Sequence, residues 1–236
     1  MRFALIFALA LAAPLAGQRI TVPLDGQWNI DESVSLNETP ASFRHTVPVP
    51  GMANLAAPPF PDVDLFDSRE IINNRVRKGV LPESAIVTNA GISRQKRNYF
   101  WYEKRFRVPA RKEVAILKIN KAQFGTAVWL NGRKSGEHLS CFTAGYFNVT
   151  DAIDWNGENR LVVRVGAHPG VLPEGIPAGT DFEKLKWTPG IYDSVSLLLG
   201  DNPIIETVQV APRIKSSEII VETKLRNYGA ARAAEL

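Results

Sequence analysis

Closely spaced aspartates are the first candidates for chemistry in this sequence. Acid–base catalysis needs one carboxyl group that donates a proton and a second that acts as base or nucleophile. The candidate pairs are Asp62 with Asp64 and Asp151 with Asp154. Aspartate side chains also accept backbone hydrogen bonds in turns and at helix caps. Because that role explains both pairs, we predict that they are turn and cap residues and that this chain has no catalytic carboxylate pair.

The histidines and the cysteine are the next candidates. His45, His138 and His168 are scattered and do not show the H-E-x-x-H spacing of a zinc site. Calcium bound by loop oxygens is an alternative, but no aspartate-rich loop has a recognisable calcium-ligand spacing. We therefore predict no metal and no cofactor. Cys141 is the only cysteine and cannot form an internal disulfide. A nucleophilic thiol also needs a base, and we therefore expect Cys141 to be a small buried side chain.

The densest basic segment, residues 93–112, surrounds a run of aromatic residues and could bind single-stranded nucleic acid. The net charge of +4 is modest for 236 residues, and the charges are spread along the chain. A two-residue period places Phe100, Tyr102, Phe106 and Val108 on one face of a strand. We therefore predict a structural strand here and no nucleic-acid partner.

The first 17 residues have the pattern of an export signal. Met1 and Arg2 precede an apolar run from Phe3 to Ala13, and small residues follow up to Gly17. The run is shorter than the ~20 apolar residues of a membrane-spanning helix. Gln18 stands where a lipid-anchored protein would have its cysteine. We predict a signal peptide over residues 1–17, a secreted or periplasmic protein, and no membrane contact after the signal is removed.

The remaining sequence has an all-β pattern, in which short apolar runs recur between clusters of Gly, Pro, Asn and Asp. The opening strands are predicted at 19–22 and 26–30, and the Pro-rich residues 47–61 are predicted to be loop because proline donates no ladder hydrogen bond. One short helix is expected within 64–79, followed by a long connection over 82–98.

The second half holds the clearest local signals. Asn131-Gly132 separates two extended runs and predicts a type I′ hairpin turn. After a turn at 155–159, alternating residues in 160–165 predict a strand with Leu161, Val163 and Val165 facing the core. A strand resumes at 191–199. After Pro203 a new series begins at 208–210 and 219–221, with too few strands to close a second sandwich.

Several ordered motifs resemble those of the N-terminal sugar-binding domain of glycoside hydrolase family 2. The matching segments are Leu24 to Trp28 (L-x-G-x-W), Val47 to Gly51 (V-P-G), Trp101 to Pro109 (W-Y-x-x-x-F-x-V-P), Val128 to His138 (V-x-L-N-G-x-x-x-G-x-H), Gly157 to Val165 (G-x-N-x-L-x-V-x-V) and Trp187 to Val195 (W-x-x-G-I-x-x-x-V). The resemblance implies a jelly-roll β-sandwich of the galactose-binding type over residues 18–202. Residues 203–236 would begin an immunoglobulin-like second domain.

The resemblance also implies sugar-binding positions. Asn98, Asp181, Lys186 and Trp187 lie in segments that approach the active site in the family, and an aromatic ring with a few polar groups is what a sugar ring needs. Packing in the core remains an alternative for Trp187, and it is the role expected for Trp28, Trp101 and Trp129. Two departures matter: Ser140-Cys141 replaces a Gly pair, and Lys184 replaces the Asp of the galactosidase branch, so galactose specificity does not carry over.

In the family, two glutamates on a (β/α)₈ barrel of about 250 residues carry out the hydrolysis. Such a barrel would lie beyond Leu236. The expected function is therefore that of a non-catalytic sugar-binding domain of an exported O-glycosidase, with carbohydrate and the parent chain's barrel as partners. The alternatives are a free-standing carbohydrate-binding module and an interaction domain that has lost its sugar.

Overall fold

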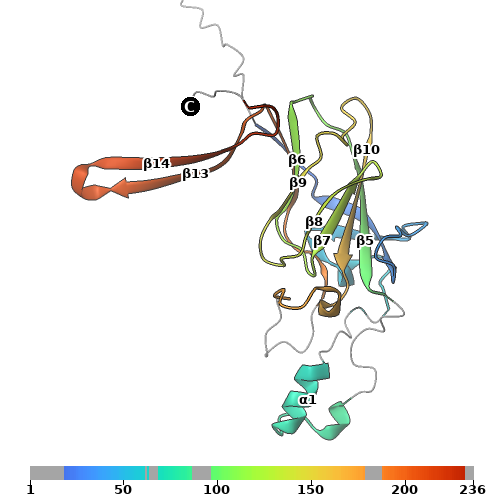
Figure 1. The fold of residues 1–236 in the computed structure, drawn as a ribbon. Coiled ribbons are helices and arrows are strands. Elements are labelled where there is room, and N and C mark those ends of the chain that lie inside the picture. Colours follow the sequence, from blue (N-terminus) through green and yellow to red (C-terminus); the bar gives the residue numbers. More distant parts are fainter. Residues whose placement is uncertain (1–18, 62, 64–68, 87–96, 179–187, 232–236) are drawn as a thin grey trace, which may run out of the picture. The chain divides into compact units, whose positions relative to one another are not determined.

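The computed structural model describes residues 19–61, 63, 69–86, 97–178 and 188–231, and the regular secondary structure of these residues is mainly antiparallel strands (Figure 1). The all-β prediction is therefore confirmed. The chain divides into two compact units, a larger one over Thr21–Leu199 and a smaller one from Gly200 onward. Within the described residues, no helix is both long and apolar enough to cross a membrane. The predicted signal peptide lies outside the described residues.

The larger unit is a sandwich of two sheets. The four-stranded sheet has the order β1-β12-β6-β9. Its strands are β1 (Ile20–Pro23), β12 (Val195–Gly200), β6 (Val114–Ile119) and β9 (Gly145–Asn148). The six-stranded sheet has the order β3-β2-β5-β10-β7-β8. Its strands are β3 (His45–Val49), β2 (Gly26–Ser33), β5 (Tyr99–Phe106), β10 (Asn159–Gly166), β7 (Thr126–Leu130) and β8 (Arg133–His138).

The core lies between the sheets and follows one row of cross-strand neighbours. Ile30, Tyr102, Val163 and Val128 are direct partners across β2, β5, β10 and β7, and all four are buried. The next residue of that row, Gly136 on β8, faces β9 of the other sheet, because a Cβ built there would lie 3.3 Å from the Phe147 ring. This row therefore forms the inner face of the six-stranded sheet.

The opposite, outer face of the six-stranded sheet is also partly buried. The alternation in 160–165 predicts burial of one side, yet Val162 and Arg164 are buried as well. β10 lies between β5 and β7, and the segment after β2 crosses its outer side: Leu36 accepts a hydrogen bond from Arg164. The burial of Val162 and Arg164 therefore depends on the central position of β10 in the sheet. The alternation of apolar residues in the sequence does not show that position.

The prediction of a loop over residues 47–61 is wrong in its first part. β3 runs through Pro48 to Val49, and the two-residue strand β4 (Gly51–Met52) follows, then a 3₁₀ turn at Ala53–Leu55. Proline is tolerated because β3 is an edge strand. Thr46 donates its N–H away from β2, to Ala57 O at 2.9 Å. The nitrogen of Pro48, two residues later, faces the same way and interrupts no ladder bond.

The local turn predictions are confirmed. Asn131 and Gly132 have φ of 52° and 83°, as a type I′ turn requires. Asp154 Oδ1 accepts the N–H groups of Asn156 and Gly157, both at 2.9 Å, so this aspartate is a turn residue. The helix α1 (Arg69–Arg77) lies within the predicted 64–79, and the connection after it contains a 3₁₀ turn at Glu83–Ala85. Asp62, Asp64 and residues 87–96 lie outside the described residues.

The smaller unit is a two-stranded hairpin of β13 (Ile204–Arg213) and β14 (Glu218–Arg226). Within the described residues after Gly200, these are the only strands. One face of the hairpin is apolar and exposed, because Val208, Val210 and Pro212 pair with Thr223, Val221 and Ile219. The predicted boundaries at 18–202 and 203–236 remain predictions.

Candidate functional site

Asn98, the described member of the four predicted sugar-binding residues, joins the ends of three strands. Its backbone N–H donates to Ser33 O at the end of β2, and its carbonyl accepts from Ala167 N just after β10, both at 2.8 Å. The side-chain amide donates to Val34 O at 3.1 Å, and its oxygen lies 3.0 Å from Nε2 of His168. Asn98 is half-buried, and its hydrogen bonds connect the ends of β2 and β10 with the start of β5.

The neighbouring Arg97 makes this end rigid. Its side chain is fully buried and pairs with Glu32 of β2. It also donates to Pro61 O at 2.8 Å, and its Cζ lies 5.6 Å from the Phe60 ring and 5.4 Å from the Phe100 ring. A buried guanidinium with a carboxylate, a carbonyl and two ring faces is held in one position. Asn98 is thus fixed from the side of β5.

Asp181, Lys186 and Trp187 lie outside the described residues. The described residues on either side of them, Ala178 and Gly190, both form hydrogen bonds with Gln123. The Gln123 amide donates to Ala178 O at 3.1 Å. The Gln123 N–H and carbonyl bond the carbonyl and N–H of Gly190, both at 2.9 Å. Gln123 is itself nearly buried. Residues 178 and 190 are therefore anchored at one point of the fold.

Gln123 and Asn98 lie at the same end of the sandwich. Phe124, next to Gln123, exchanges two backbone hydrogen bonds of 3.2 Å with Gly166, and the following Ala167 donates to Asn98. The structure thus brings Asn98 and the anchor of the 179–187 segment to one edge. We call this set of residues, Asn98, Gln123 and His168, the loop edge.

A two-stranded sheet adjoins the loop edge and explains two glycines of the sequence motifs. β11 (Gly190–Ile191) pairs with β4, and Ala53 donates to Pro189 O at 2.8 Å. A Cβ on Gly190 would lie 2.6 Å from Gly51 O and 2.7 Å from Met52 Cα, so only glycine allows this approach. The V-P-G and W-x-x-G-I segments therefore meet at this edge.

The buried carboxylates of the sandwich are held by arginines. Burial would raise the pKa of Asp31, but hydrogen bonds from Arg44 and from the backbone outweigh it and lower that pKa. Likewise burial would raise the pKa of Glu103, and hydrogen bonds from Arg160 and Asn29 lower it. A glycosidase general acid needs a raised pKa. These two carboxyl groups are therefore unsuited to that role.

The histidines and the cysteine have structural environments. His45 Nδ1 lies 2.6 Å from Pro58 O and its ring stacks on Phe60, whereas His138 Nε2 lies 3.0 Å from Thr143 O. Among the described residues, no group of three His, Cys, Asp or Glu side chains could hold a metal ion. Cys141 is buried, as predicted, and burial raises the pKa of its thiol.

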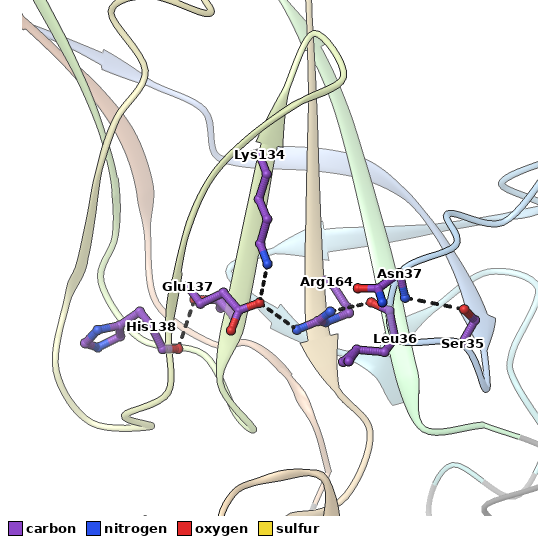
Figure 2. A network of polar contacts seen from close by, with 8 residues as sticks. Ser35, Leu36, Asn37, Lys134, Glu137, His138 and Arg164 are labelled. Atoms are coloured by element: carbon purple, nitrogen blue, oxygen red, sulfur yellow. Dashed lines mark hydrogen bonds and ion pairs between the residues drawn. The ribbon is translucent and has the colours of Figure 1, made fainter.

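A second polar cluster lies on the outer face of the six-stranded sheet, and sequence reasoning missed it (Figure 2). Arg164 of β10 and Lys134 of β8 both contact Glu137 of β8. Trp129 lies beside them with its ring 5.2 Å from that of Trp101. Trp28 and Trp101 are buried as expected, but Trp129 is only half-buried and belongs to the outer face rather than the core.

The comparisons with known proteins agree with this architecture. No model of a protein family matches the sequence, and no curated protein does. The solved β-glucuronidase of an uncultured Clostridium species is 20% identical, with a TM-score of 0.58 over 96% of this chain and 36% of that chain. The β-glucuronidase of Ruminococcus gnavus is 16% identical, with a TM-score of 0.58 over 90% of this chain and 33% of that chain.

A chain from Bacteroides fragilis, named only as a candidate β-galactosidase, is 17% identical with a TM-score of 0.61 over 90% of this chain and 29% of that chain. At these identities the likeness establishes the fold. The present chain spans about a third of the length of these solved chains.

Proposed function

We propose that this chain is the non-catalytic, N-terminal sugar-binding sandwich of an exported glycosidase of family 2. The observation that carries the proposal is the shared fold, which extends over nine-tenths or more of this chain in three glycosidase-type structures. Fold alone does not define activity. The ordered motifs of the sequence supply the second support, because they occupy positions where the fold depends on them.

Those positions are specific. Trp28 of the opening motif is buried and donates from Nε1 to Leu24 O at 2.8 Å. Asn131 of the hairpin motif donates to Ala152 O and to Asn159 Oδ1, both at 2.8 Å. Gly190 of the closing motif packs against Gly51 of the V-P-G turn. A chance occurrence of these four motifs would not be expected to place them at contacts on which the sandwich depends.

In this proposal the catalytic glutamates belong to a barrel elsewhere in the parent protein. The solved chains that the fold resembles are about three times as long as this one, which leaves room for such a barrel. The loop edge, with Asn98 and the segment holding Asp181, Lys186 and Trp187, would form the rim of the barrel's sugar pocket. Residues 1–17 would direct export, and residues 203–236 would begin an immunoglobulin-like domain.

The test compares this 236-residue chain with the longest product of its gene on a panel of nitrophenyl glycosides. We expect hydrolysis by the longer product and none by the chain alone. Hydrolysis by the chain alone would refute the non-catalytic assignment. If neither hydrolyses any glycoside while the chain binds glycans on an array, the protein is a free-standing carbohydrate-binding module and the enzyme proposal fails.

A further inference from the structure

The outer face of the six-stranded sheet presents two cations around a single carboxylate oxygen. Oε1 of Glu137 lies 2.6 Å from Lys134 Nζ and 3.5 Å from a terminal nitrogen of Arg164. Figure 2 shows the Glu137 carboxylate between the two cations. Its position is set by the sheet: Ala127 lies directly between Arg164 and Glu137 in the cross-strand row, and its small side chain leaves room for the guanidinium to reach across.

An indole ring forms the floor of this cluster. Trp129 is the cross-strand partner of Lys134, whose Nζ lies 5.6 Å from the ring centroid, and Arg164 Cζ lies 5.7 Å from the same centroid. Both distances are within the range of cation–π attraction. The Trp101 ring also lies against Trp129, but Trp129 is only half-buried, so part of its indole remains exposed beside the two cations.

The cations differ in exposure. Arg164 is 8% exposed, is fixed by its bond to Leu36 O, and lies 4.8 Å from the Tyr99 ring. Lys134 and Glu137 are 47% and 39% exposed. Arg164 is thus a preorganised cation at the back of the cluster, whereas Lys134 and Glu137 lie at its front, where solvent or a ligand reaches them.

The charges of the cluster do not cancel, since Lys134 and Arg164 bring two positive charges and Glu137 one negative charge. Burial lowers the pKa of Arg164, and Glu137 opposes that shift only in part. The ion pair between Arg164 and Glu137 is long, at 3.5 Å. A second or better-placed anion would therefore be stabilised here.

We propose that Lys134, Arg164 and Trp129 form a binding site for a sugar that carries a carboxylate, in which the ligand's carboxylate takes the place of Glu137 and its ring packs on the exposed part of the indole. The proposal rests on the proposed function in taking the ligand to be a carbohydrate. The C–H face of a pyranose packs on an aromatic ring, and a carboxylate accepts from both cations, so one uronic acid residue meets both parts of the cluster.

Glu137 acts in this site as an internal competitor, which gives the proposal a sign that a purely structural network lacks. Removing the Glu137 charge should strengthen binding of an external carboxylate, whereas removing the Lys134 charge should weaken it. Lys134 and Glu137 are both well exposed. E137Q removes the carboxylate partner of the nearly buried Arg164, which keeps its hydrogen bond to Leu36 O, so the folding of E137Q is checked by urea unfolding alongside its binding.

The experiment titrates the full chain with methyl galacturonide, with methyl galactoside and with acetate, and follows tryptophan fluorescence and heat. We expect galacturonide to bind at least about tenfold more tightly than either control, as a charge-assisted hydrogen bond predicts. E137Q should tighten galacturonide binding several-fold and K134Q should weaken it by about tenfold. The matched control is R133Q, which removes a nearby exposed cation that pairs with Asp151 and should leave binding unchanged.

Equal affinity for galacturonide and galactoside, or for galacturonide and acetate, would overturn the site, as would weaker binding in E137Q or an equal loss in R133Q and K134Q. The proposed function is judged separately, by glycoside hydrolysis in the longer gene product. Hydrolysis without galacturonide binding by this chain defeats only the present inference. Galacturonide binding without hydrolysis supports the site and defeats only the enzyme proposal.

Discussion

Replacing Asp31 by Asn removes the charge from a buried carboxylate on the outer face of the six-stranded sheet. The side chain of Asp31 is 1% exposed and accepts four hydrogen bonds. Arg44 donates from Nε at 2.8 Å, from a terminal nitrogen at 2.9 Å and from its backbone N–H at 3.1 Å, and Glu32 donates its N–H at 2.8 Å. The carboxylate thereby ties the end of the segment after β2 back to the sheet.

The expected loss follows from these contacts. Removing one partner of a fully buried ion pair costs about 3–5 kcal/mol. Arg44 is 67% exposed and regains water, and Asn keeps the shape and one acceptor oxygen of Asp. We therefore expect D31N to lower the free energy of unfolding by about 2–3 kcal/mol at neutral pH. R44A leaves the two backbone donors in place and should cause a smaller loss.

The pH dependence identifies the charge as the cause. The folded-state pKa of Asp31 is lowered, so its contribution is complete above the unfolded pKa of about 3.9 and is lost as the pH falls through the folded value. Urea unfolding followed by the fluorescence of the buried Trp28 and Trp101 should show a wild-type advantage over D31N at pH 6 that shrinks below pH 4. An advantage of the same size at pH 3 would refute the electrostatic explanation.

Three further predictions concern other parts of the sandwich. Q123A removes the donor to Ala178 O and should lower the free energy of unfolding by about 1 kcal/mol. It should also speed proteolytic cleavage between residues 178 and 190, measured by mass spectrometry, and an unchanged cleavage rate would contradict the role of Gln123 as an anchor. G132A should lower the free energy of unfolding by about 1–2 kcal/mol through backbone strain alone, because Gly132 has φ of 83° and an added Cβ would meet no atom within 4 Å. An unchanged urea midpoint would contradict this explanation. The buried Cys141 thiol, whose pKa is raised by burial, should react with a disulfide reagent at pH 7 only after denaturation, as absorbance of the released thiolate would report.

The sequence predicts the parts of this fold that local chemistry determines. Asn131-Gly132 forms the expected turn because positive φ is a property of those two residues. The apolar residues Leu161, Val163 and Val165 identify a strand and its inner face, because successive side chains of a strand point to opposite faces of the sheet. Asn98 could be singled out only through the family resemblance, and its contacts with Ser33, Ala167 and His168 come from strands distant in sequence.

Other features depend on strand order, which local patterns do not contain. Pro48 fits in a strand because β3 is at an edge. Gln123 stands in no motif, and its role comes from its position opposite Gly190. Arg164 and Leu36 are 128 residues apart and meet only because β10 occupies the middle of the sheet beneath the segment after β2. The sequence signal of that cluster is the position of Arg164 between Val163 and Val165 of the same strand.

The ion pairs on the outer face of the six-stranded sheet affect both the burial of its charged residues and the pKa of its carboxyl groups. Asp31, Trp101, Arg164, Ala127 and Glu137 form one continuous cross-strand row. Asp31 is buried and Glu137 is 39% exposed, and each carboxylate has a cation beside it: Arg44 pairs with Asp31, and Arg164 and Lys134 pair with Glu137. The cation offsets part of the cost of taking the charge out of water. The same pairing lowers the pKa of both carboxyl groups, whereas a proton donor in glycoside hydrolysis needs the opposite shift. The ion pairs that stabilise these charges therefore leave Asp31 and Glu137 unsuited to act as the proton donor in glycoside hydrolysis.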